Sequence, residues 1–162
     1  MARANEKTNV MRILEQKKIP YTAYCYLDSG VVSGPEVAAV LEQDPAHVYK
    51  TLVTVGHSGT HYVFVLAVDR ELDLKRAAAA VGEKNIAMLK SKNLLPLTGY
   101  VHGGCSPVGM KKQFKTVIDA PAEQLETLFC SGGRIGYQVE LAPTELQRAV
   151  PFTYAEISTK MP

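Results

Sequence analysis

The clearest pattern along the chain is an apolar hairpin in its first half. Two apolar runs, 51–55 (TLVTV) and 61–68 (HYVFVLAV), are separated by a glycine-containing turn at 56–59 (GHSG). The second run is apolar at almost every position, which is typical of a strand buried on both faces. We therefore expect this hairpin to form the centre of the sheet.

Helical patterns lie on both sides of this hairpin. Thr8 or Asn9 can cap a first helix of about ten residues, and Ser33 to Glu36 has the form of a capping box with proline in the first turn. The alanine-rich segment 69–80 predicts a helix after the hairpin. Helices are therefore expected before and after the central strands.

The remaining predicted elements are short. Strands are expected at 21–27, 86–89, 114–118, 129–130, 137–141 and 152–157, and helices at 91–95, 121–128 and from Pro143 onward. Because strands and helices do not follow each other as a βαβ series, the pattern indicates an α+β fold. We expect a single domain over residues 1–162, with a curved, mixed or antiparallel sheet and helices packed around it.

Composition narrows the class of protein. The 162 residues are 46% hydrophobic, which is enough for one sizeable core, and the formal net charge is only +2. A dedicated binder of duplex DNA carries far more positive charge, so contact with a nucleic acid should be local. The N-terminal residues contain no apolar signal segment, and no apolar run approaches the roughly 18 residues of a membrane span. We expect no membrane association.

The cysteines argue against a disulfide framework and against a metal site. Cys25, Cys105 and Cys130 are odd in number, widely separated and without C-x-x-C spacing. His57 and His61 flank a turn without a third ligand at zinc spacing. We therefore expect reduced thiols, a cytoplasmic protein, and neither a metal nor another cofactor.

A glycine-rich stretch, 98–115 (TGYVHGGCSPVGMKKQFK), interrupts the alternation of strands and helices. Glycine permits positive φ and close backbone approach, and Pro107 removes one donor, so the loop can present bare N–H groups to a carbonyl, carboxylate or phosphate. A simple turn between two strands is the competing interpretation. The loop lacks the Gly-Lys-Ser/Thr ending of a P-loop, and 131–136 (SGGRIG) lacks dinucleotide-binding spacing.

Three side chains are candidates for chemistry. Lys50 stands where a helical turn meets the strand 51–55, and it either reaches water or points into a cleft. His102 could be an acid or base, or could alternate outward on a strand. Cys105 could be a nucleophile stabilised by nearby N–H groups, but no Cys-His-Asp set accompanies it, which favours a small filler residue.

Four segments taken together resemble a known family. They are 19–24 (IPYTAY), 47–53 (HVYKTLV), 98–112 (TGYVHGGCSPVGMKK) and 127–143 (TLFCSGGRIGYQVELAP). Their combined spacing is similar to that of the YbaK family of aminoacyl-tRNA deacylases, which are free-standing relatives of the editing domain of bacterial prolyl-tRNA synthetases. The likeness spans nearly the whole chain and implies a mixed α+β fold without a metal.

The resemblance also implies roles for individual residues. Lys50 matches the family's essential lysine, and Gly103 begins its G-x-x-x-P loop; we expect both to be catalytic. The other residues of that loop, together with three further positions, match the family's substrate pocket: Tyr26, Thr51, Gly104, Cys105, Ser106, Pro107 and Gln138. Gln138 departs from the family pattern, which often has an acidic residue at this position.

The implied activity is removal of a mischarged amino acid from tRNA. Within the family the likeness is greatest to members that deacylate Cys-tRNA(Pro), either through attack by the thiol of the substrate or through attack by water. The implied partners are the 3′ aminoacyl end of tRNA(Pro) and, in a transient complex, prolyl-tRNA synthetase. A deacylase for Ala-tRNA(Pro) and a non-catalytic module that binds the tRNA 3′ end are the alternatives.

Overall fold

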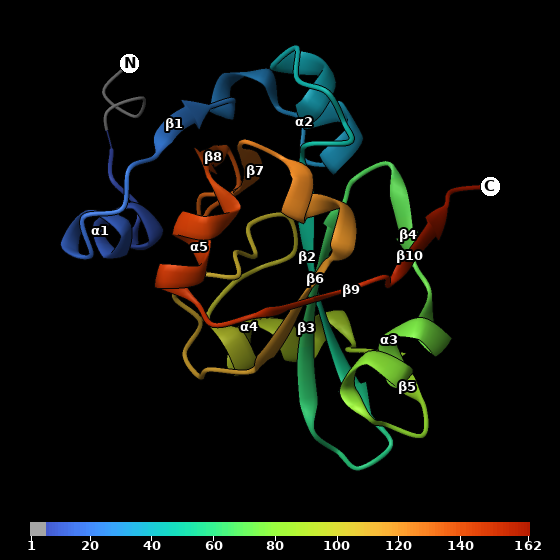
Figure 1. Ribbon diagram of the computed structural model, residues 1–162. Helices are drawn as coiled ribbons and strands as arrows, with labels where there is room; N and C mark the ends of the chain where they lie inside the picture. The colour runs from blue at the N-terminus through green and yellow to red at the C-terminus, as the bar shows by residue number, and fades with distance from the viewer. Residues whose placement is uncertain (1–5) are drawn as a thin grey trace.

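The structure, a computed structural model, describes residues 6–162 and contains five α-helices and ten strands over that range (Figure 1). The helices are α1 (Asn9–Gln16), α2 (Gly34–Val40), α3 (Leu74–Val81), α4 (Ser91–Thr98) and α5 (Pro143–Ala149), with short 3-10 helices η2 (Leu27–Ser29) and η3 (Ala120–Gln124). The strands are β1 (Thr22–Cys25), β2 (Tyr49–Gly56), β3 (His61–Ala67), β4 (Arg70–Leu72), β5 (Ile86–Met88), β6 (Lys115–Asp119), β7 (Leu128–Ser131), β8 (Tyr137–Leu141), β9 (Thr153–Ala155) and β10 (Ser158–Lys160).

The largest sheet has five strands in the order β5-β2-β3-β6-β9. The predicted hairpin forms its antiparallel β2–β3 pair, and β6 and β9 add to it in parallel. Phe64 of β3 packs with Ala77 and Ala78 of α3 on one face, while Val63 and Val65 belong to the main core on the other. The prediction that this hairpin lies at the centre of the sheet is confirmed, and so is the prediction that its second strand, β3, is buried on both faces.

A second sheet of three antiparallel strands, β1-β8-β7, lies beside the first, and β10 pairs with β4 in a third (Figure 1). The first two sheets are linked where Val48 and Phe129 form an isolated parallel bridge and the Phe129 N–H donates to the His47 carbonyl at 2.9 Å. The expected α+β fold with mixed pairing is confirmed.

The two predicted helix starts in the first forty residues are correct. The Thr8 hydroxyl accepts a hydrogen bond from the Met11 N–H at 3.2 Å and so caps α1. Ser33 accepts from the Glu36 N–H at 3.4 Å, and its hydroxyl donates to the Glu36 carboxylate at 2.9 Å. Ser33 thus caps the N-terminus of α2 as the sequence predicts, but the Glu36 carboxylate accepts from the Ser33 hydroxyl and not from its backbone N–H, as a full capping box would have it.

Three other helix predictions need correction. Residues 70–72 form β4 because β10 pairs with them, and α3 begins only after Asp73, whose Oδ1 accepts from the Lys75 and Arg76 N–H groups. The helix expected at 121–128 is the short 3-10 helix η3. Helix α4 does not end before Pro96 but continues to Thr98, with Pro96 inside the helix.

One edge of β2 is only partly covered. β5 pairs with Thr54–Gly56 of β2, and the last link between the two segments is the Leu89 N–H, which donates to the Val53 carbonyl at 3.1 Å. The chain then turns into α4, so β5 does not reach Tyr49–Val53. This open edge is where the main cavity lies. Over residues 6–162 no helix has the length and apolar character needed to cross a bilayer.

Candidate active site

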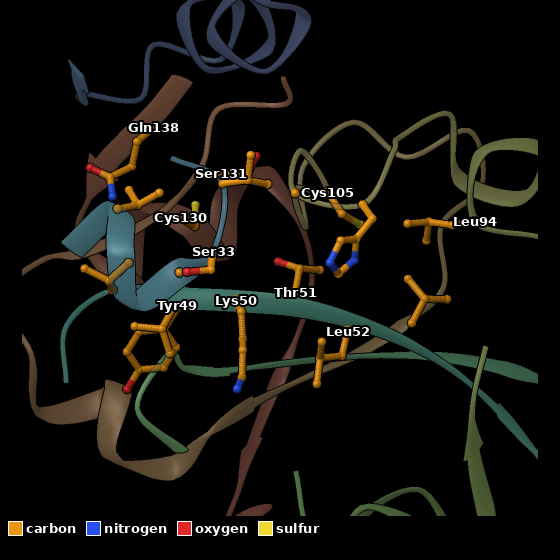
Figure 2. Close-up of a pocket in the computed structure, with 18 of the residues that line it drawn as sticks. Ser33, Tyr49, Lys50, Thr51, Leu52, Leu94, Cys105, Cys130, Ser131 and Gln138 are labelled. Carbon is orange, nitrogen blue, oxygen red and sulfur yellow. The ribbon is translucent and has the colours of Figure 1, made fainter. Parts of the chain in front are cut away.

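A cavity of about 400 Å³ lies along the open edge of β2 (Figure 2). Its walls come from segments far apart in the sequence: β2 itself, the start of α2, the connection from β5 to α4, the glycine-rich loop, and the paired strands β7 and β8. A space of this size is at the lower end of the range for small-molecule sites. It is large enough for an aminoacyl group with part of a nucleoside.

The cavity brings together most of the residues that the sequence singled out. Its lining includes Tyr26, Lys50, Thr51, Gly103, Cys105 and Gln138. Gly104, Ser106 and Pro107 are buried behind this lining and are not part of it. His102 lines the cavity as well. Three of the four segments that carry the family resemblance, 47–53, 98–112 and 127–143, therefore meet at one cavity, while the individual roles of these residues stay predictions.

Lys50 is half-buried, and its ammonium donates a hydrogen bond to the Arg70 carbonyl at 2.6 Å. Figure 2 shows its side chain leaving β2 on the side opposite to Thr51 and Cys105, as alternation along a strand requires. Burial lowers the pKa of the Lys50 ammonium, and the Glu71 and Asp69 carboxylates oppose this shift in part. The ammonium is thus held by a backbone carbonyl and does not face the glycine-rich loop in this structure.

Thr51 points to the other face, and its Oγ1 is a buried polar atom without a hydrogen-bond partner among residues 6–162. A buried hydroxyl without a partner costs about 1–3 kcal/mol. The Thr51 backbone N–H and C=O also face the open edge. The backbone groups of every second residue in a strand point to the same edge, and Thr51 lies two residues before Val53, whose carbonyl bonds to Leu89 at that edge. Thr51 therefore offers a hydroxyl and backbone groups to a polar ligand.

The glycine-rich loop is held by its own hydrogen bonds. The Gly104 N–H donates to the Val101 carbonyl at 3.0 Å, the Val108 N–H donates to Ser106 Oγ at 3.2 Å, and the Tyr100 hydroxyl donates to the Val108 carbonyl. The prediction that the loop presents bare N–H groups does not hold at Gly104, whose donor closes a turn. The loop is instead a fixed wall of the cavity.

Gly103 has a backbone conformation that favours glycine. Its φ is +89°, and a Cβ placed there would lie 2.7 Å from Cγ1 of Val32. The neighbouring Gly104 also lies close to backbone, since a Cβ would be 3.0 Å from the Ile135 nitrogen. The two glycines thus let the loop pack against the start of α2 and against the 131–136 turn.

Cys105 is unsuited to act as a nucleophile. Burial raises the pKa of its thiol to about 12, so the thiol is protonated at neutral pH. A thiolate is the nucleophilic form of cysteine. The structure therefore supports the interpretation of Cys105 as a small side chain in the cavity wall.

Gln138 is almost completely buried, with 2% of its surface exposed, and its amide forms a reciprocal pair with Gln43. Gln43 Nε2 donates to Gln138 Oε1 at 2.8 Å, and Gln138 Nε2 donates to Gln43 Oε1 at 2.9 Å. The pair ties β8 to the segment between α2 and β2. No feature of the sequence indicated Gln43, which lies 95 residues away from its partner.

The sequence analysis also missed two serines that line the cavity. Ser33 is the N-cap of α2, and Ser131 ends β7, where its hydroxyl accepts from the Gly133 N–H at 3.0 Å. The glycine cluster after Ser131 was the available signal, because a turn at the end of a strand often places a polar side chain at a sheet edge. Ser33 was recognised only as a helix cap.

Comparison with known proteins assigns the chain to a family. Residues 29–149 match the family model of the aminoacyl-tRNA editing domain. The chain therefore belongs to the aminoacyl-tRNA editing domain family, which confirms the resemblance seen in the sequence.

One relative agrees with this assignment, and two solved structures share the fold. A protein of Enterococcus faecalis named as a Cys-tRNA(Pro)/Cys-tRNA(Cys) deacylase, EbsC, is 43% identical over 159 residues, which cover 98% of this chain and 97% of the relative. The crystal structure of the hypothetical protein APE2540 matches with a TM-score of 0.86 at 22% identity, covering 94% of this chain and all of the other. A crystal structure described as that of a trans-editing enzyme for prolyl-tRNA synthetase matches with a TM-score of 0.80 at 21% identity, covering 95% of this chain and 99% of the other.

Proposed function

We propose that this protein is an aminoacyl-tRNA deacylase that removes cysteine from mischarged Cys-tRNA(Pro) and so protects the fidelity of translation in trans. Membership of the editing-domain family and the name of the Enterococcus faecalis relative support this proposal. The structural observation that carries it is the cavity at the edge of β2, in which the Thr51 hydroxyl is a buried polar atom available to a ligand.

The chemistry required is modest. An aminoacyl ester is already an activated acyl group, so a site that holds it rigidly and stabilises the developing oxyanion can be sufficient. In one route the thiol of the bound cysteine attacks its own carbonyl carbon, the ester C–O bond breaks, and the ribose oxygen takes up the proton. In the other route a water molecule attacks the same carbon. Neither route uses the protein's Cys105, whose thiol stays protonated.

Lys50 is the proposed cationic group. Its long side chain is flexible, so the ammonium can leave the Arg70 carbonyl and turn toward an ester oxygen or the terminal phosphate when substrate enters. The position of Lys50 in the cavity lining and its match to the family's essential lysine support this role. Thr51 would then bind the aminoacyl group from the opposite face of β2.

The decisive experiment compares deacylation of Cys-tRNA(Pro) by the wild type, by Lys50→Ala and by Lys75→Ala, an exposed lysine on α3 that serves as the matched control. We expect Lys50→Ala to lower kcat by about 100-fold or more, as for loss of a group that stabilises the transition state, with an unchanged circular dichroism spectrum. Wild-type turnover in Lys50→Ala would refute the role of Lys50. Absence of turnover by the wild type would refute the function itself.

Substrate choice needs a second assay. One methylene or a comparable group in a small pocket is worth only roughly 1–3 kcal/mol, so the cavity alone discriminates poorly among small amino acids. Comparing Cys-tRNA(Pro) with Ala-tRNA(Pro) decides between the proposed activity and its nearest alternative. Turnover of neither substrate, with retained binding of tRNA, would indicate a non-catalytic module that binds the 3′ end.

Selectivity for tRNA(Pro) is proposed to come from a transient complex with prolyl-tRNA synthetase. A net charge of only +2 supports this, because the protein has little excess charge with which to grip a whole tRNA. Addition of the synthetase should raise selectivity for tRNA(Pro) over other cysteinylated tRNAs. Full selectivity of the isolated protein would contradict the proposal.

A further inference from the structure

The positive charge of this protein is concentrated in one segment. Of the chain's 18 lysines and arginines, six lysines fall between residues 84 and 118, and this segment contains no aspartate or glutamate. The remaining residues therefore hold 12 basic side chains against 16 acidic ones. A nearly neutral protein thus has one strongly basic part and an acidic remainder, which is typical of a surface that binds a polyanion.

The basic segment forms a wall of the cavity. Leu89 and Ser91 line the cavity on either side of Lys90, and Leu94, His102 and Cys105 from the same segment line it further along. Lys90 is the N-cap of α4, and Lys92 lies in its first turn. These two lysines therefore lie at the mouth of the proposed active site.

Two more lysines lie at the other end of α4. The Lys111 N–H donates to the Thr98 carbonyl at 3.0 Å, and a Cβ on Gly99 would lie 3.3 Å from Cγ of Lys111, so the Lys111 side chain covers the C-terminus of the helix. Lys112 follows it directly. The eight residues of α4 span about 12 Å, which matches about three to four stacked nucleotides at 3.4 Å each.

These four lysines are available to a ligand. Lys90, Lys92, Lys111 and Lys112 are exposed, and the ion pairs among residues 6–162 involve none of them. Exposed apolar side chains on the same segment, Met88, Leu95 and Val101, would also suit a protein partner. The run of lysines without any acidic residue favours a polyanion over a protein, whose surface carries both signs of charge.

We propose that Lys90, Lys92, Lys111 and Lys112 form a phosphate-binding surface along α4 that holds the last nucleotides of the tRNA 3′ end while the terminal adenosine enters the cavity. This inference rests on the proposed function. It assigns a path to the RNA: along α4, past the mouth at Lys90, and into the space beside Thr51.

The test compares two double variants with equal loss of charge. Lys90→Ala with Lys111→Ala removes one lysine from each end of α4, and Lys75→Ala with Lys160→Ala removes two exposed lysines elsewhere. KM and kcat for Cys-tRNA(Pro) are measured at several salt concentrations, first without and then with the synthetase. The second substrate is 2′(3′)-O-cysteinyladenosine, which contains the ester and no phosphate.

We expect the first variant to raise KM for Cys-tRNA(Pro) by up to about fivefold per lysine, as for an exposed charge pair. The dependence of log KM on log salt should become shallower by about 0.7 per lysine. The control variant should stay within about twofold of the wild type. The loss in kcat/KM should be several times larger on Cys-tRNA(Pro) than on cysteinyladenosine.

Three results would overturn the inference: equal KM values and salt slopes in the two variants, equal losses on both substrates, or a loss that occurs only when the synthetase is present. The last would assign the lysines to a protein contact. If the wild type deacylates neither substrate, the proposed function fails, and binding of uncharged tRNA(Pro) to the same variants then decides on the surface alone. Equal affinities of the two double variants for uncharged tRNA(Pro) would refute the phosphate-binding surface.

Discussion

Replacement of Gln138 by glutamate tests how the amide pair shapes the cavity wall. The change preserves size but replaces the Nε2 donor, which bonds to Gln43 Oε1 at 2.9 Å, by a second oxygen. Once ionised, the carboxylate would face that oxygen without a proton between them. Water could not easily solvate this charge, because only 2% of the surface of residue 138 is exposed.

The magnitude follows from these contacts. Loss of one hydrogen bond with an acceptor left unpaired costs about 1–3 kcal/mol, and burial of the charge adds to this unless the carboxyl is protonated. When protonated, the carboxyl can donate to Gln43 Oε1 and accept from Gln43 Nε2, which restores the reciprocal pair. We therefore expect Gln138→Glu to be near wild-type stability at pH 4 and about 2–4 kcal/mol less stable at pH 8.

The sign of the pH dependence is fixed by linkage. Burial raises the pKa of the introduced carboxyl above its value in the unfolded chain, so the folded state binds more protons between the two pKa values. The free energy of unfolding, relative to wild type, must then fall as pH rises from about 4.3, at up to about 1.4 kcal/mol per pH unit, and level off above the folded pKa. Urea unfolding across this range measures it.

The matched control is Gln124→Glu, the same substitution at an exposed position of η3. Its difference in stability from wild type should stay within about 0.5 kcal/mol at every pH. A Gln138→Glu variant that is equally stable relative to wild type at pH 4 and pH 8 would refute the reasoning. That result would mean that the carboxylate is solvated by the cavity and that the pair with Gln43 carries little energy.

Two further predictions concern the glycine-rich loop. Cys105→Ser should retain deacylation within about tenfold, since the Cys105 thiol, with a pKa of about 12, is protonated at neutral pH. Iodoacetamide at pH 8 should modify the half-buried Cys25 before Cys105. A far larger loss of kcat in Cys105→Ser would support the hypothesis that Cys105 is the nucleophile. Gly103→Ala should lower the free energy of unfolding by about 2–4 kcal/mol, from positive φ and the Val32 contact together. Gly59→Ala, with φ +90° and open space, should show the φ penalty alone, so equal losses measured by urea unfolding would exclude the contact.

Local patterns in the sequence were sufficient for much of the fold. Alternation and apolar runs predicted the β2–β3 hairpin, and the polar residues Thr8 and Ser33 predicted where α1 and α2 begin, because these signals depend on neighbours within four residues. The segment 69–80 was misjudged because its first residues pair with β10, some 88 positions away in the chain. Such distant pairing overrides local helix propensity.

For the candidate site, the sequence indicated several of the residues but not the contacts that they make. Family resemblance indicated Lys50, Thr51 and the 103–107 loop, and the structure places the first two and part of the loop in one cavity. It could not reveal that the Lys50 ammonium bonds to Arg70 or that the Gly104 N–H closes a turn, because these contacts depend on tertiary geometry. Gln43 has no sequence signal at all, since its partner is set by the packing of β8 against the segment after α2.

The short length of β5 has a consequence for how such a site could be created or destroyed. β5 ends at Met88, and the chain leaves the sheet at Lys90 to begin α4. A strand longer by about four residues would hydrogen-bond to Tyr49–Val53 and fill the space with its own backbone, as an ordinary sheet neighbour does. The cavity thus lies where the β-sheet lacks a neighbouring strand, and a small insertion after Met88 that lengthens β5 would fill it.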